Sequence, residues 1–244
     1  MKLTRREIAN LESKYDAIMK VLAEALQIDL TANNDKNQQT EYRQAHDARI
    51  DIRPNMDDIP LGVSNRHIHL SQTDLNALFG EGYQLTRTKD LSQPGQYACK
   101  ETVILCGPKG VIENVRVLGP VRNQTQAEVL TGDCFKLGIT APPRLSGDLI
   151  GTPGITLAGP KGAIRIKEGL ITALRHIHMT LADASRFGVA DGQTVSIQIG
   201  GACGGIYHNV LIRANDSSSL ECHLDTEEAN AMKLSSGNRI KIIK

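Results

Sequence analysis

The chain has 244 residues and a formal net charge of +1, with 28 Lys and Arg against 27 Asp and Glu. This near neutrality excludes a general electrostatic attraction to nucleic acid or to an acidic membrane surface. Aromatic residues make up only 3%, with no Trp, which argues against base-stacking surfaces. Because hydrophobic residues reach 40% in a length ample for a buried core, we expect a globular protein that binds neither nucleic acid nor membrane.

The cysteines and the N-terminus indicate the cellular compartment. The five cysteines are odd in number and include no Cys-x-x-Cys pair, so neither a disulfide framework nor a thiolate zinc site is indicated. The N-terminus carries charged residues without the apolar segment of an export signal, and no stretch approaches the ~20 apolar residues of a membrane span. We therefore expect a cytoplasmic protein.

Residues 1–30 differ from the rest of the chain. Thr4 and Glu7 have the spacing of a capping box. Apolar residues follow at steps of three and four, which predicts an amphipathic helix: Ile8, Leu11, Tyr15, Ile18, Leu22 and Leu26. Residues 31–51 are mostly polar and predict a linker. Such a helix either docks on a partner, packs on its own domain or pairs with a copy of itself.

From residue 52 onward the pattern is mainly β. Short β-rich segments are broken by Gly and Pro, which favours barrels or sandwiches: 102–105, 115–118, 154–157, 194–199, 210–212 and 239–242. Helices are fewer, and we expect them at 72–79, 181–187 and 226–233.

The body of the chain also repeats itself. The segment 66–71, Arg-His-Ile-His-Leu-Ser, recurs as Arg-His-Ile-His-Met-Thr at 175–180, and Asp74 then matches Asp183 at the same offset. Repetition of this kind predicts two related halves, each presenting one His-x-His.

His-x-His on a strand places both imidazoles on one face, roughly 6 to 7 Å apart, where they can bind one cation. A single pair is more often two ordinary strand histidines, but two identical copies favour one or two metal sites with open positions for substrate. Candidates for completing the ligand shells are Glu128, Glu221, His208, His223 and Asp225. Cys222 should point away from the metal, because neighbouring strand residues face opposite sides.

Several motifs together resemble one known family. They are VSNRHIHLS at 63–71, LGPVRNQTQAE at 118–128, SGDL at 146–149, RHIHM at 175–179 and HLDTEEAN at 223–230. In this order they resemble the phosphate propanoyltransferase family, the phosphotransacylases of bacterial propanediol-utilisation and related microcompartments. The resemblance spans about 59–244 and does not cover the first 50 residues.

The resemblance implies a set of site residues. One zinc is expected on His67, His69 and Glu128, with the sulfur of coenzyme A as its fourth ligand, and a second zinc on His176, His178 and His223, with water. Arg122 is expected to bind phosphate. Coenzyme A contacts fall on Ser64, Lys89, Arg116, Leu118 and Asn230.

The resemblance also implies two adjacent β-barrels with capping helices. One barrel would be formed by 52–65 and 174–244, and the other by 66–173. Together they would form one catalytic unit.

The expected activity is a reversible phosphate acyltransfer. A short-chain acyl-CoA, propanoyl-CoA or acetyl-CoA, reacts with phosphate to give the acyl phosphate and CoA, with two zinc ions per chain. The alternatives are a metal-dependent thioester or phosphoester hydrolase and a non-catalytic, metal-stapled microcompartment component. We expect a homo-oligomer inside a bacterial microcompartment, with residues 1–30 as an encapsulation peptide that binds shell or cargo proteins.

Overall fold

The computed structural model describes residues 57–243. The chain divides into two compact units, Met1–Ile52 and Arg53–Lys244, and all described residues belong to the second. The helix predicted over 1–30 and the linker predicted over 31–51 lie outside the described residues. Within the described part of the chain, no helix has the length and apolar character that crossing a bilayer requires.

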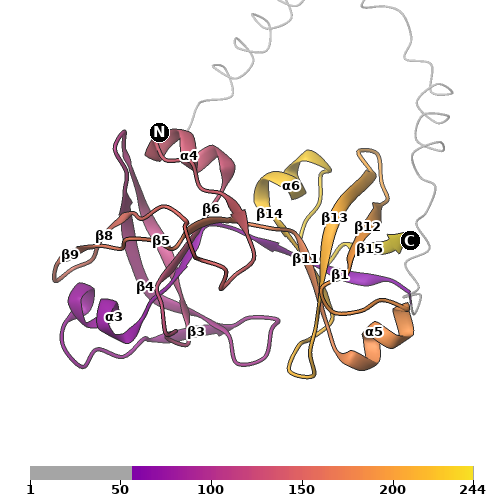
Figure 1. Cartoon of the computed structure of the whole chain (residues 1–244), viewed down its shortest axis with the longest axis horizontal. Coiled ribbons are helices and arrows are strands. Elements are labelled where there is room, and N and C mark those ends of the chain that lie inside the picture. The colour runs from indigo at the N-terminus through magenta and orange to yellow at the C-terminus, as the bar shows by residue number, and fades with distance from the viewer. Residues whose placement is uncertain (1–56, 244) are drawn as a thin grey trace, which may run out of the picture. The chain divides into compact units, whose positions relative to one another are not determined.

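One sheet closes into a six-stranded barrel. In the order of their pairing its strands are β1 (Ile59–Ser64), β14 (Glu221–Asp225), β11 (His176–Met179), β13 (Gly205–Ala214), β12 (Thr194–Ile199) and β15 (Arg239–Ile243). The barrel closes because β1 pairs with β14 in parallel on one side and with β15 in antiparallel on the other. The first described strand thus completes a barrel built mainly from the last third of the sequence (Figure 1).

The middle of the chain builds a second, nine-stranded sheet. Its strands follow the order β7 (Pro143–Arg144), β10 (Leu170–Ala173), β6 (Gln126–Val129), β2 (His67–His69), β5 (Val111–Gly119), β4 (Tyr97–Cys106), β8 (Thr156–Ala158) and β9 (Ala163–Arg165), with β3 (Arg87–Asp90) paired to β4. The mainly β fold is confirmed. This sheet is a half-barrel, open between β7 and β9, rather than a second closed barrel.

Four short helices accompany the described strands: α3 (Gln72–Phe79), α4 (Thr131–Leu137), α5 (Leu181–Phe187) and α6 (Thr226–Ala231). The hydroxyls of Ser71 and Thr180, at equivalent places in the repeat, cap α3 and α5 by accepting from the N–H groups of Asp74 and Asp183. The helices predicted at 72–79 and 181–187 are confirmed, and the third ends two residues earlier than predicted. Helix α4 was not predicted.

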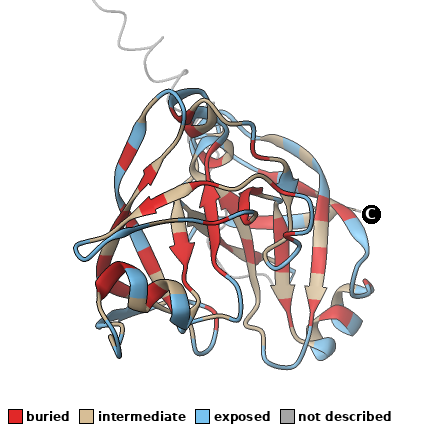
Figure 2. Ribbon diagram, turned by 60° about the vertical axis from the view of Figure 1, so that its left-hand side comes forward, coloured by how far each residue is buried: buried red, intermediate tan, exposed pale blue. Residues whose placement is uncertain are grey.

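Each sheet has its own apolar core. Side chains alternate between the core and the other face along the strands, as in β12, where alternate residues are buried. Figure 2 shows the buried residues concentrated in the strands of both sheets. The middle residues of the two His-x-His strands belong to these cores: Ile68 packs in one and Ile177 in the other, both without exposed surface.

Replacing Ile68 or Ile177 by alanine should lower the free energy of unfolding by about 2 to 5 kcal/mol, since each removes buried methyl groups and leaves a cavity. Urea denaturation at equilibrium measures this loss. Ile150→Ala is the matched control, because Ile150 is 84% exposed and its removal should change the free energy by less than about 0.5 kcal/mol. Equal effects at buried and exposed positions would contradict the assignment of the two cores.

Candidate metal and phosphate site

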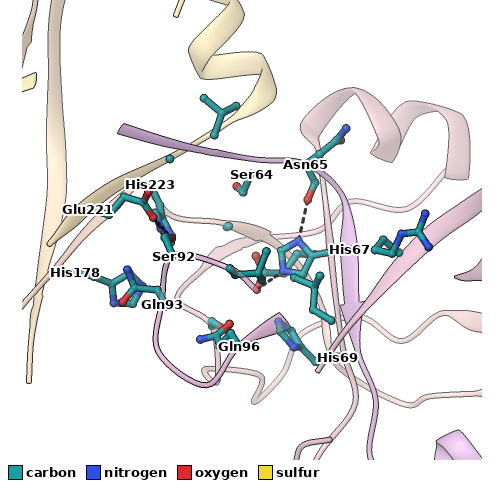
Figure 3. Close-up of a pocket in the computed structure, with 18 of the residues that line it drawn as sticks. Ser64, Asn65, His67, His69, Ser92, Gln93, Gln96, His178, Glu221 and His223 are labelled. Atoms are coloured by element: carbon teal, nitrogen blue, oxygen red, sulfur yellow. Dashed lines mark hydrogen bonds and ion pairs between the residues drawn. The ribbon is translucent and has the colours of Figure 1, made fainter. Parts of the chain in front are cut away.

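Both His-x-His strands begin where the chain passes between the two sheets. The chain leaves the barrel after β1 and enters β2 at His67, and it leaves β10 and re-enters the barrel in β11 at His176. These crossings bring both histidine pairs to one cavity of about 660 Å³. Figure 3 shows the labelled histidines on its two sides, His178 and His223 to the left and His67 and His69 to the right.

The first ligand group consists of His67, His69 and Glu128. Strand β2 pairs with β6 so that His67 lies opposite Glu128, and the nearest ligand atoms of the three residues lie within 4.8 Å of one another. His67 donates from Nδ1 to the carbonyl oxygen of Asn65 at 2.8 Å, which leaves its Nε2 toward Glu128 Oε1 at 3.4 Å. Two imidazoles and a carboxylate are a common set of protein ligands for zinc.

The second ligand group consists of His176, His178 and His223. Strand β11 pairs with β14 so that His176 lies opposite His223, and these ligand atoms also lie within 4.8 Å of one another. His176 donates from Nδ1 to the carbonyl oxygen of Leu174 at 2.7 Å, the same contact that His67 makes in the first group. Its Nε2 therefore carries a lone pair, and it lies 3.1 Å from Nε2 of His178.

The charge states of most of these ligands suit a cation; the pKa of His67 is instead raised, because Glu128 outweighs the effect of burial. Burial lowers the pKa of His176 to about 4 and of His178 to about 3, and neighbouring imidazoles add to the effect. Burial likewise holds the pKa of His69 well below its usual value. Burial would raise the pKa of Glu128, but His67, His69 and Arg122 outweigh it and hold this pKa below its usual range. Neutral imidazoles and an ionised carboxylate are the forms that bind metals.

Each ligand group also contains one buried ring nitrogen without a hydrogen-bond partner in the described chain. These nitrogens are Nδ1 of His69 and Nδ1 of His178. A buried polar atom without a partner costs about 1 to 3 kcal/mol, and each of these rings belongs to one of the two ligand groups. The donor sets of the two groups fit one cation each.

Arg122 enters the same cavity. Its Nη1 donates to the hydroxyl of Ser146 at 2.8 Å, and its backbone N–H donates to the carbonyl oxygen of Leu70 at 2.9 Å. Burial lowers the pKa of this guanidinium, and Glu128 acts against the shift. Within the described chain, the Arg122 guanidinium forms no ion pair with a carboxylate. Its N–H groups can therefore bind an oxyanion such as phosphate.

The cavity also gathers most of the predicted coenzyme A contacts. Its lining includes Ser64, Lys89, Arg116 and Leu118. Asn230 does not line it and is exposed on α6.

Among the residues that the sequence left as candidates, only some lie beside the ligand groups. Oε2 of Glu221 lies 2.6 Å from Nε2 of His223. Asp225 instead caps α6, and the His208 ring bonds to Ser196 at an exposed position. Cys222 points away from the cavity and is buried in the barrel core, as predicted.

Sequence reasoning missed other residues that line this cavity. Arg213 enters from β13, where it pairs with His178. Ser92, Gln93 and Gln96 come from the loop between β3 and β4 and line the same cavity as both histidine groups (Figure 3). The alternation of β13 could have placed Arg213 on the histidine face, but nothing local marks the loop residues.

Comparison with known proteins agrees with these features. The family model described as phosphate propanoyltransferase matches residues 60–235. A phosphate propanoyltransferase of Thermotoga maritima is 54% identical over 186 residues, which cover 76% of this chain and 89% of that protein. Proteins of the same name from Rhodobacter capsulatus and Clostridioides difficile are 52% and 50% identical over 186 residues, covering 76% of this chain and 86% and 89% of theirs. The chain belongs to the phosphate propanoyltransferase family.

Proposed function

We propose that the protein is a phosphate acyltransferase that interconverts a short-chain acyl-CoA plus phosphate with the acyl phosphate plus CoA. The substrate would be propanoyl-CoA or acetyl-CoA, and two zinc ions would be bound per chain. The observation that carries the proposal is that two candidate metal-ligand groups line one cavity together with Arg122, which forms no ion pair within residues 57–243.

In this reaction a phosphate oxygen forms a bond to the carbonyl carbon, and the C–S bond breaks with its electron pair going to sulfur. Zinc bound in these groups would supply Lewis acidity for the thiolate and for the polarised carbonyl. His67, His69 and Glu128 would hold one ion, and His176, His178 and His223 the other. Arg122 orients phosphate through two N–H groups and offsets its charge.

The remaining predicted residues would bind coenzyme A. Lys89 and Arg116 bring positive charge to the cavity, which suits the phosphates of this substrate. Ser64 and Leu118 line the cavity beside them, while Asn230 would contact a part of coenzyme A that extends beyond it.

Product analysis tests the proposal. The purified protein is incubated with propanoyl-CoA with and without phosphate, and acyl phosphate is trapped with hydroxylamine as the hydroxamate. We expect phosphate-dependent release of CoA with an equal amount of hydroxamate. Free propanoate released without phosphate would instead indicate a hydrolase, and no CoA release would favour a structural component.

We further propose that residues 1–30 are an encapsulation peptide and that the enzyme is a cytoplasmic homo-oligomer inside a bacterial microcompartment. Deleting residues 1–45 should leave kcat and KM unchanged, because Arg122 and all six candidate metal ligands lie outside the deleted segment. The same deletion should move a fluorescently tagged enzyme out of the compartments into the surrounding cytoplasm. An unchanged distribution in cells would overturn the targeting role.

A further inference from the structure

Each ligand group has one further residue beside it, at an equivalent place in the two sheets. Neither the repeat motif nor the family resemblance assigns a role to these residues. In the pairing of β2 with β6, His69 lies opposite Gln126. In the pairing of β11 with β14, His178 lies opposite Glu221. Gln126 and Glu221 thus occupy equivalent places, and each stands two residues before the third ligand of its group, on the same strand face.

In the first group, the Gln126 amide holds the third ligand. Its Nε2 donates to Oε1 of Glu128 at 2.6 Å and to the hydroxyl oxygen of Ser146 at 2.8 Å. Its Oε1 accepts from the backbone N–H of Gly147 at 2.8 Å. Because this side chain is 1% exposed and both ends of the amide are bonded, its donor end is fixed toward Glu128.

In the second group, the Glu221 carboxylate makes the corresponding contact. Its Oε2 accepts from Nε2 of His223 at 2.6 Å and from the hydroxyl of Ser92 in the loop between β3 and β4 (Figure 3). A Cβ at Gly62 would lie only 2.7 Å from Cδ of Glu221, so glycine at this place makes room for the carboxylate.

The chemistry of each pair is complementary. A ligand carboxylate such as Glu128 offers only acceptors, and it faces a fixed donor. A ligand imidazole such as His223 has one N–H that can donate a hydrogen bond, and this N–H faces an acceptor. Partners of this kind fix the orientation of a metal ligand and, for histidine, the tautomer.

We propose that Gln126 and Glu221 are matched positioning residues, each of which orients the third metal ligand of its group through a hydrogen bond of the required polarity. The proposal rests on the metal-binding part of the proposed function.

Because Glu221 accepts and Gln126 donates, exchanging Glu and Gln should have different effects at the two positions. In Glu221→Gln the new amide keeps an oxygen that accepts from His223, so the contact survives. In Gln126→Glu the new carboxylate has no N–H to donate, and it places a second negative charge beside Glu128. A role in packing alone would not distinguish these two isosteric exchanges.

The experiment measures metal content and the two metal affinities by chelator competition on the full chain. Glu221→Ala and Gln126→Glu should each weaken one of the two affinities by about 10- to 100-fold and leave the other unchanged. Glu221→Gln should stay within about threefold of wild type. Gln124→Glu is the matched control, because exposed Gln124 also donates to a carboxylate, that of Glu168 at 3.1 Å, and it should leave both affinities unchanged.

Gly62→Ala provides a second test that removes no polar group and remains informative if Gln126→Glu does not fold. The added methyl group displaces the Glu221 carboxylate, so one affinity should fall while the other stays at the wild-type value. The proposal would be overturned if Glu221→Gln bound metal as weakly as Glu221→Ala, or if Gln126→Glu had the metal affinities of the wild type. Wild-type protein that binds no metal would instead overturn the metal-binding part of the proposed function.

Discussion

Replacing Arg122 by alanine should lower kcat/KM for phosphate by about 100- to 1,000-fold, the usual cost of removing one preorganised group that stabilises developing charge. The guanidinium lines the cavity together with both ligand groups and forms no ion pair within the described chain. Its loss removes the charge and the planar fork that we propose for phosphate. A phosphate-dependent CoA-release assay measures the effect.

Further variants separate phosphate binding from general damage. Arg122→Lys keeps the charge but loses bidentate geometry, so it should recover only part of the activity. Arg165→Ala, at an exposed position on β9, should behave as wild type. Metal content should be unchanged in all three, because Arg122 belongs to neither ligand group. Full activity of Arg122→Ala would remove this residue from the proposed mechanism.

The repeated His-x-His could be interpreted from the sequence because a strand has a period of two. That period alone puts His67 and His69 on one face, Ile68 on the other, and the same three roles 109 residues later on β11. The identity of the third ligand could not follow from this pattern. Glu128 and His223 reach their groups through the register of β6 with β2 and of β14 with β11, and register between distant strands is set by the whole sheet.

Helix α4 and the open edge of the half-barrel also could not be predicted from local sequence patterns. Helix α4 has only seven residues, contains Gly132, and follows the N-cap residue Leu130, whose side chain accepts no capping hydrogen bond. Its start is stabilised by Asp133, which accepts from the Leu130 N–H at 3.0 Å. The half-barrel could not be distinguished from a closed barrel, since strand propensity does not say whether the edge strands β7 and β9 pair.

The largest effects are expected from the histidines themselves. Under the proposed function, His67→Ala and His176→Ala should each reduce bound zinc from two ions per chain to one, because each removes one of three candidate protein ligands from a separate group. Metal catalysis contributes several kcal/mol to a barrier, so each variant should lose activity on the order of 1,000-fold or more.

The two variants should differ in their affinity for the thiol. Under the proposed function the first ligand group holds the sulfur of coenzyme A, so His67→Ala should lose binding of free CoA as well as its zinc. His176→Ala should keep binding CoA, because the first group is intact. Elemental analysis and calorimetric titration with CoA measure the two properties on the same samples.

His208→Ala is the control for a general effect of removing an imidazole. This ring bonds to Ser196 at an exposed position and belongs to neither ligand group, so zinc content, CoA affinity and turnover should all match the wild type. Retention of two zinc ions by His67→Ala would contradict the first ligand group. Equal loss of CoA binding in both variants would contradict the division of labour, because a thiol held by one group should be insensitive to the loss of the other.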